Sequence, residues 1–199
     1  RPGGPSASAP ALGAGSPEVA GGNLRYASEY QPGNGPWERP ISFNKYNGVL
    51  RYAQGPPANG FNTTAMAYGA HWNSTDQIPQ RAVDSGLVGL FGTLDPTDGG
   101  NSSRYSLSGE WRQSDGNVSR AVTLFAIRSR LNLYSNFTYF LDNPVNGDQF
   151  LQAESRTVLG GEASQTWFTH WGGRHVWNTL GLQVRGDRVS PLELASTEA

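Results

Sequence analysis

Polar and apolar residues alternate with a period of two along a series of long segments that begins near Asn23. This period is typical of β-strands whose two faces meet different surroundings. The pattern predicts seven strands, many of them longer than the ~5–6 residues usual in globular proteins. We expect them at 23–31, 44–54, 60–72, 103–113, 117–134, 151–171 and 174–188.

The segments between these strands alternate in length. Short links occur at 55–59 (GPPAN), 114–116 (SDG) and Gly172-Gly173, whereas long links span 32–43, 73–102 and 135–150. Tight turns at one end and large loops at the other are typical of outer-membrane barrels. We therefore predict an all-β fold, an antiparallel meander of about seven long strands that is part of a larger transmembrane β-barrel.

Within single strands, one face is apolar and the other polar or charged. We predict that seven side chains point toward lipid: Leu107, Phe125, Ile127, Leu131, Leu180, Leu182 and Val184. A charged set falls on the opposite, lumen-facing positions: Arg51, Glu110, Arg112, Arg128, Arg130, Glu162 and Arg185.

Turn chemistry predicts how neighbouring strands align. A two-residue Gly172-Gly173 turn sets Ala163 opposite Leu182, so that apolar faces apolar. For the 114–116 link, a two-residue Asp-Gly turn sets Ser106 opposite Phe125, and a three-residue loop with a bulge at Gly116 sets Tyr105 there instead. We expect the second register, because it keeps every apolar side chain on one face.

Composition supports a turn-rich chain without long helices. Of 199 residues, 26 are Gly and 13 are Pro, and the net charge is −1, which gives no indication of nucleic-acid binding. No run approaches the ~18 apolar residues of a transmembrane helix. We expect a flexible low-complexity tail at 1–22, a partial barrel at 23–188, and a C-terminal tail or truncated loop at 189–199.

The sequence contains no recognised motif for catalysis or metal binding. The chain has no Cys, and it contains neither a nucleophile elbow, a zinc-protease motif nor a phosphate loop. Asn, Asp and Gly in the acidic loops 95–101 and 142–148 favour turns over a calcium site. We expect no enzyme activity, no cofactor and no metal, although His170 and His175 approach each other across the Gly-Gly turn.

Several long stretches resemble TonB-dependent receptor barrels. They are GPWERP (35–40), NGVLRYAQG (47–55), WNSTDQIPQRAVDSGL (72–87), GTLDPTDGGNSSRYSLSGEW (92–111), LNLYSNFTYFLDNPVNGDQF (131–150) and GGEASQTWFTHWGGRHVWNTLGLQVRGDR (160–188). Together they cover about 25–188. The chain is thus similar to members of this family over most of its length.

The resemblance implies a function in the outer membrane of a Gram-negative bacterium. Such receptors are 22-stranded barrels with an N-terminal plug domain, and they import scarce nutrients such as metal chelates with energy from the inner-membrane TonB protein. In this sequence we find no plug-like domain, energy-coupling box or signal peptide. The resemblance therefore implies a barrel fragment that does not transport alone, with outer-membrane lipid, a plug domain, TonB and a small nutrient ligand as partners.

Two loops and the lumen face hold the candidate ligand-binding residues. We expect loops 73–102 and 135–150 to lie next to each other outside the cell and to fold against each other or over the barrel mouth, because both contain apolar side chains. They would then form either a lid that helps to capture substrate or a structural cap on the rim. The candidates are Asp76, Arg81, Asp84, Tyr139 and Asp142 in the loops, and Arg51, Arg112, Arg128 and Arg130 in the lumen. The alternative is a soluble secreted β-sandwich that acts as a binding module.

Overall fold

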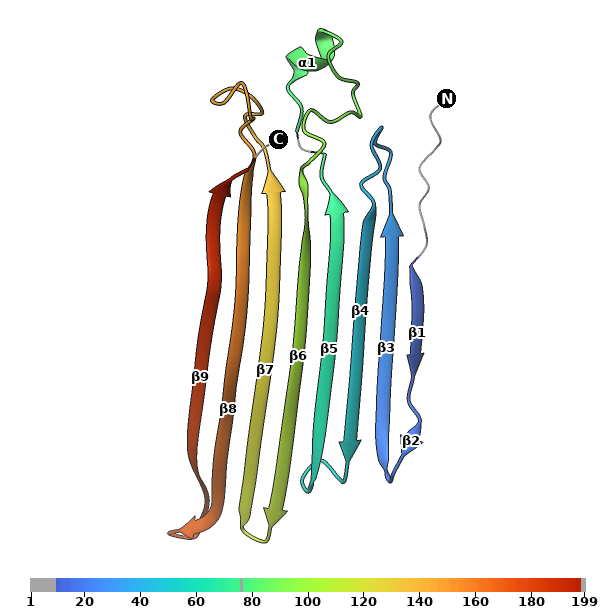
Figure 1. The fold of residues 1–199 in the computed structure, drawn as a ribbon. Coiled ribbons are helices and arrows are strands. Elements are labelled where there is room, and N and C mark those ends of the chain that lie inside the picture. The colour runs from blue at the N-terminus through green and yellow to red at the C-terminus, as the bar shows by residue number, and fades with distance from the viewer. Residues whose placement is uncertain (1–9, 76, 198–199) are drawn as a thin grey trace.

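Nearly all of the regular structure lies in one antiparallel sheet of nine strands (Figure 1). The computed structural model describes residues 10–75 and 77–197. The strands are β1 (Ala11–Gly15), β2 (Glu18–Val19), β3 (Gly22–Gly33), β4 (Phe43–Gln54), β5 (Gly60–Asn73), β6 (Gly99–Asp115), β7 (Val118–Ser135), β8 (Phe150–Trp171) and β9 (Arg174–Ser196). The order is β1-β3-β4-β5-β6-β7-β8-β9, and β2 also pairs with β3. The all-β, antiparallel meander is therefore confirmed.

The seven strands predicted from the alternation correspond to β3 through β9. The largest difference is at β9, which continues to Ser196, so the expected tail over 189–199 is wrong up to that residue. A bulge lets the strand continue, because Ser190 and Pro191 together lie opposite Ser155. Proline has no N–H to donate to a ladder, and a bulge is one of the few places where a sheet accepts it.

The N-terminal tail predicted over 1–22 is also wrong in its described part. Ala11–Gly15 and Glu18–Val19 form strands against β3, and residues 1–9 lie outside the described residues. The small side chains of Ala11–Gly15 show no alternation of polar and apolar residues, but they allow this strand to lie close to its neighbour β3. A Cβ on Gly15 would lie 2.5 Å from the ring of Tyr26, so the missing side chain makes room for that ring.

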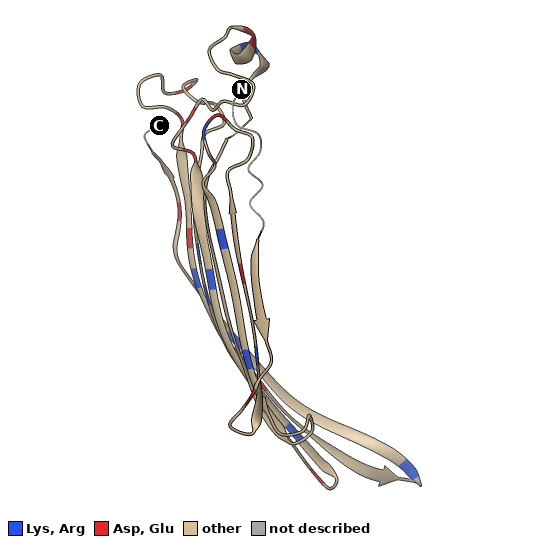
Figure 2. Cartoon of the chain, turned by 90° about the vertical axis from the view of Figure 1, so that its right-hand side faces the viewer, with Lys and Arg blue, Asp and Glu red and all other residues tan. Residues whose placement is uncertain are grey.

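Short and long connections lie at opposite ends of the sheet, as the link lengths predict (Figure 1). The long connections are 34–42, 74–98 and 136–149, and the second contains the one-turn helix α1 (Gln80–Asp84). Edge-on, the sheet curves along its length (Figure 2). Among the residues the structure describes, no helix is long and apolar enough to cross a membrane.

Two of the predicted registers have different outcomes. Ala163 pairs with Leu182, as expected from the Gly172-Gly173 turn. In contrast, Tyr105 pairs with Arg128, and Phe125 lies opposite Ser108. The hairpin closes through Gly116 and Asn117, with Gly116 at φ +54°, the left-handed conformation that a type II′ turn requires at its first position. This glycine-first turn replaces the predicted three-residue loop.

Following the register from strand to strand divides the side chains into two faces. The apolar face carries most of the exposed large hydrophobic side chains that lie on strands: Tyr26, Tyr30, Tyr46, Leu50, Phe61, Tyr105, Leu107, Trp111, Leu124, Leu159, Trp171, Leu180, Leu182 and Val184. The polar face carries most of the charged side chains, including Glu29, Lys45, Arg51, Arg104, Glu110, Arg112, Glu154, Arg156, Glu162, Arg185 and Asp187.

The register of β7 corrects part of the predicted face assignment. Leu107, Leu180, Leu182 and Val184 share the apolar face as predicted, but Phe125, Ile127 and Leu131 lie on the polar face. Arg128 and Arg130 lie on the apolar face, not on the predicted polar one. The prediction failed because β7 has apolar residues on both sides: Val122 and Leu124 on one, Phe125 and Ile127 on the other.

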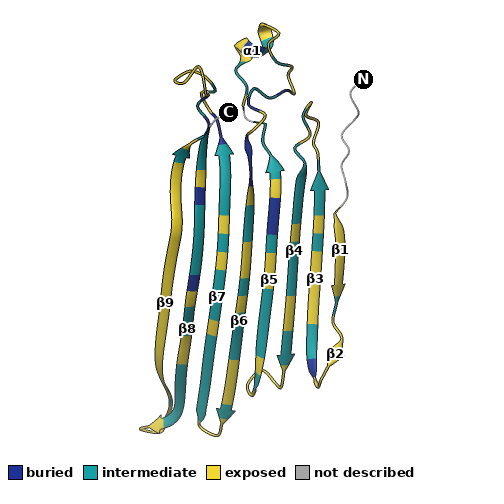
Figure 3. Cartoon of the chain, viewed as in Figure 1, coloured by how far each residue is buried: buried dark blue, intermediate teal, exposed yellow. Residues whose placement is uncertain are grey.

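The two outer strands of the sheet, β1 and β9, pair with only one neighbour each among the described residues. β9 is exposed along almost its whole length (Figure 3). Each edge therefore presents unpaired backbone donors and acceptors, which is the condition for adding further strands.

Candidate functional site

The three long connections fold together into one cap at an end of the sheet. Glu38 N donates to Phe91 O at 3.0 Å, and the rings of Trp37 and Phe91 are 6.1 Å apart. The Tyr139 hydroxyl donates to Gln77 O at 2.6 Å. The prediction that the two largest loops fold against each other is thus confirmed.

A buried polar cluster joins these two loops below the surface of the cap. Asn136 is 0% exposed and Asp95 is 1% exposed. The Asn136 amide donates to Asp95 Oδ2 at 2.8 Å, while Asp95 Oδ1 accepts from the backbone N–H and the hydroxyl of Thr97. Buried polar groups of this kind must be hydrogen-bonded to avoid a desolvation cost. The cluster therefore holds loop 136–149 to loop 74–98.

Gln149 extends this network to the C-terminal end of the sheet. Its amide nitrogen donates to the Thr97 hydroxyl and to Asp98 Oδ1, and its amide oxygen accepts from the Thr197 hydroxyl. Because Gln149 is 3% exposed, these contacts are shielded from water. Sequence reasoning missed Asp95, Asn136 and Gln149 as a unit, because their loops are far apart in the chain.

The predicted loop residues do not converge on one site. Asp76 lies outside the described residues, and Arg81 and Asp84 are exposed on α1, where Asp84 accepts from Gln80. Tyr139 contributes to the contact between the loops. Asp142 is exposed, and its backbone N–H donates to Asp148 Oδ2.

The predicted lumen arginines separate into two pairs. Arg51 and Arg112 lie on the polar face, where they line a hollow of about 230 Å³ together with Asn62 and Glu110. Glu110 accepts from the amide of Asn62 at 2.9 Å and pairs with Arg112. Arg128 and Arg130 lie on the other face of the sheet and take no part in this cluster.

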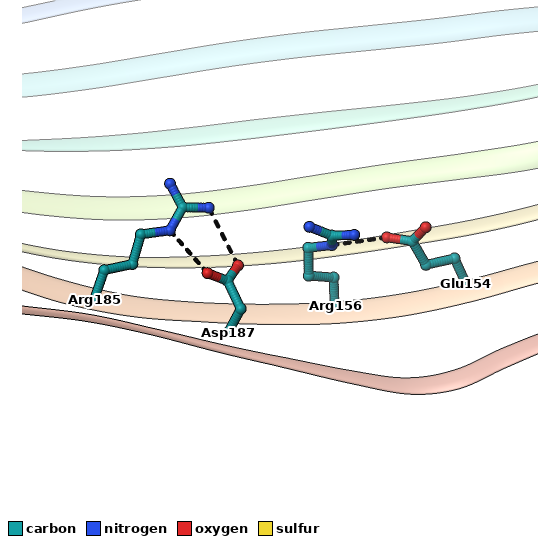
Figure 4. Close-up of polar contacts among 4 residues, drawn as sticks. All are labelled: Glu154, Arg156, Arg185 and Asp187. Carbon is teal, nitrogen blue, oxygen red and sulfur yellow. Dashed lines mark hydrogen bonds and ion pairs between the residues drawn. The ribbon is translucent and has the colours of Figure 1, made fainter.

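Four ion pairs join charged side chains in the described part of the chain, and all four lie on the polar face. Two of them follow one another along β8 and β9 (Figure 4). Arg185 binds Asp187 through two hydrogen bonds of 2.8 and 3.2 Å, and Arg156 binds Glu154 at 2.9 Å. Each cation of the polar face that is paired in this way is neutralised within the protein.

The polar face is also the hollowed one. A groove of about 820 Å³ crosses it, lined by residues of β1 and of β3 to β7. Leu12, Val49 and Met66 form its apolar part, whereas Glu29 and Arg104 supply charges. The sequence held no signal for this groove, because its walls come from strands that only the register and the curvature bring together.

On the apolar face, the exposed hydrophobic side chains form a band that runs obliquely across the strands. On β4 the band extends from Tyr46 to Tyr52, so its midpoint lies at the level of Val49, whose own side chain points to the polar face; on β9 the band is centred on Leu182. Residues that pair with one another across successive strands form a ladder row. The row through Val49 reaches β9 at Asp187, five residues away from Leu182. With ~3.3 Å per residue and ~4.8 Å between strands, the band is inclined by about 35° to the rows.

Aromatic side chains mark both margins of this band. Tyr30, Tyr46 and Tyr105 lie along the margin that faces the long loops. Phe61, Trp111 and Trp167 lie along the margin that faces the short turns. Polar side chains follow directly outside, as on β7, where Arg120 and Arg128 enclose Val122, Leu124 and Ala126.

Near the last short turn, the His170 and His175 rings are 4.3 Å apart, as the Gly-Gly turn predicts.

Comparison of the whole chain with family models, curated proteins and solved structures gives no match.

Proposed function

We propose that this chain forms part of the wall of an outer-membrane β-barrel of the TonB-dependent receptor type. In this proposal it has a transport role and not a catalytic one: the complete receptor takes up a scarce nutrient such as a metal chelate. The apolar face contacts lipid, and the polar face lines the interior, where a plug domain and the transported ligand lie. TonB supplies energy to the complete receptor.

One observation carries the proposal: the oblique apolar band with aromatic margins. Strands of membrane barrels are tilted by ≈ 35–45° to the membrane normal, and so a lipid-facing band must cross the ladder rows at about that angle. The inclination of about 35° estimated from ~3.3 Å per residue and ~4.8 Å between strands meets this requirement. Aromatic residues at both margins correspond to the two interfaces of a bilayer.

A soluble β-sandwich fits the geometry less well. In a sandwich, a second sheet packs about 10 Å from the first and covers its apolar face. The described strands all belong to one sheet, and Leu124 and Leu182 on its apolar face are 62% and 68% exposed. Lipid and additional strands at the open edges would cover this surface without a second sheet.

The proposal can be tested by cysteine scanning, since the chain contains no Cys. Single cysteines at Leu107 and Leu182 on the apolar face, and at Ser108 and Gln183 on the polar face, would carry a fluorescent label in vesicles of phosphatidylcholine. Brominated acyl chains quench only probes that touch lipid. We expect strong quenching at 107 and 182 and weak quenching at 108 and 183; equal quenching on both faces would rule out the membrane wall.

A further inference from the structure

Three arginines of the polar face, Arg112, Arg156 and Arg185, form ion pairs with carboxylates, and no such pair is found on the apolar face of the described strands. This face carries five: Arg120, Arg128, Arg130, Arg174 and Arg188. None of them belongs to the four ion pairs of the described residues, which all lie on the polar face. A side chain as strongly charged as Arg next to an apolar surface requires an anionic partner or water.

Three of these arginines gather at the margin of the band that faces the long loops. Arg128 and Arg188 both pair with Thr157, one from each side, so the two arginines lie in one ladder row. Arg130 follows Arg128 on the same face of β7. Tyr105 lies opposite Arg128, which places the cluster at the aromatic margin.

The spacing of the cluster suits a single charged headgroup. Arg128 and Arg188 are two strand steps apart, about 10 Å, and Arg128 and Arg130 are two residues apart, about 7 Å. All three side chains are exposed, and Arg128 donates to the Thr157 hydroxyl at 3.3 Å. Guanidinium groups at such separations can reach a common anion and bind phosphate oxygens in pairs.

Few carboxylates compete for these arginines on the apolar face. Among the described strands this face carries Asp115, which lies at the short turns, and Glu193, which lies beyond the bulge at Ser190 and Pro191. Asp187 is next to Arg188 in sequence but points to the polar face, where it binds Arg185. The charge of the cluster is therefore directed outward from the sheet, at the level where lipid headgroups lie in a bilayer.

We propose that Arg128, Arg130 and Arg188 form a binding site for a lipid with a phosphorylated headgroup, in the leaflet on the side of the long loops. The inference rests on the proposed membrane function, because the cluster meets headgroups only if the apolar face contacts lipid. Charge complementarity selects the occupant: three exposed guanidinium groups bind phosphate and are not neutralised by the protein.

The test uses the chain in phosphatidylcholine vesicles with a label on a cysteine at Ser103, which pairs with Arg130 on the apolar face. Quenching by brominated phosphatidic acid is compared with quenching by brominated phosphatidylcholine. Since each basic residue near a membrane surface contributes ≈ 1 kcal/mol, we expect a preference of roughly fivefold per arginine engaged. Arg128→Gln with Arg188→Gln should remove most of it, whereas Arg25→Gln with Arg104→Gln on the polar face should not.

The outcomes separate this site from the proposed membrane wall. Quenching by both lipids with no preference would overturn the headgroup site and leave the wall intact. No quenching by either lipid would overturn the wall, and the headgroup site with it. Complete loss of the preference on adding inorganic phosphate would identify a site for free phosphate instead of lipid.

Discussion

At the scale of single residues, neighbours along a strand have opposite surroundings. Leu182 is 68% exposed on the apolar face, and the next residue, Gln183, lies on the polar face opposite Glu162. The same alternation separates Arg185, which has a carboxylate partner, from Arg188, which belongs to the opposite face. The effect of a substitution should therefore depend on the face on which it lies and, on the apolar face, on its depth in the bilayer.

Leu182→Arg should destabilise the inserted protein by roughly 2–4 kcal/mol, the cost of a cation near the middle of a bilayer. Gln183→Arg introduces the same charge one residue away, on the polar face, and is its matched control. Urea titration of the protein in phosphatidylcholine vesicles measures both changes. Equal losses would contradict the assignment of the faces.

Asn136→Ala should weaken the cap. The substitution removes the amide that donates to buried Asp95, and a buried polar group that loses its hydrogen-bond partner costs about 1–3 kcal/mol. We expect faster proteolysis within 74–98 and 136–149, with the sheet unchanged by circular dichroism. Asn146→Ala, on an exposed residue of the same loop, is the control. An identical effect of both variants would argue against a role of the buried Asp95–Asn136 contact in holding the two loops together.

At the scale of elements, the strands and the loops have different sources of stability. The strands are held by the backbone hydrogen bonds between neighbours and, in the proposed membrane location, by the lipid that would cover the apolar face. The loops depend on specific side-chain contacts, such as Gln149 with Thr97 and Asp148 with the backbone N–H groups of Asp142 and Asn143. Loop 136–149 should therefore respond to changes that leave the sheet intact.

Acid should loosen loop 136–149. The backbone N–H of Asp142 and further hydrogen bonds lower the pKa of Asp148 below its usual 3.8. Because the folded pKa is the lower one, the stabilisation is complete above pH 3.8 and is lost as the pH falls through the folded value. Hydrogen exchange in this loop should rise over that range, and Asp148→Asn should abolish the rise; an unchanged pH profile in that variant would contradict the assignment.

At the scale of the whole molecule, the described sheet leaves its apolar face and its two edges uncovered. Exposed apolar patches on ordinary monomers seldom exceed a few hundred Å², and open edges invite pairing with other chains. Lipid at the face and further strands at the edges would satisfy both. The groove on the polar face would then open toward the barrel interior.

In buffer without detergent, the isolated chain should therefore associate instead of remaining a folded monomer. Detergent micelles should cover the apolar face and allow β-structure to form. Sedimentation velocity and circular dichroism in both conditions measure this. A monodisperse monomer with cooperative unfolding in buffer alone would contradict the prediction, since a soluble sandwich behaves in that way.

The sequence by itself determined the seven long strands, their order and the separation of short turns from long loops. Alternation and turn residues are local signals, and the Gly172-Gly173 turn even determined the β8–β9 register. The strands β1 and β2 escaped prediction because the small residues of Ala11–Gly15 do not alternate in polarity.

Only the tertiary structure decided which face each side chain of β7 occupies. Phe125 and Leu124 are both apolar and adjacent, so composition alone is neutral between the two registers, and the conformation of Gly116 selects one. That selection moved Arg128 and Arg130 from the predicted lumen to the apolar face. The tertiary structure also brought Asp95, Asn136 and Gln149 together, because contacts between distant loops depend on the position of the strand ends and on no local pattern.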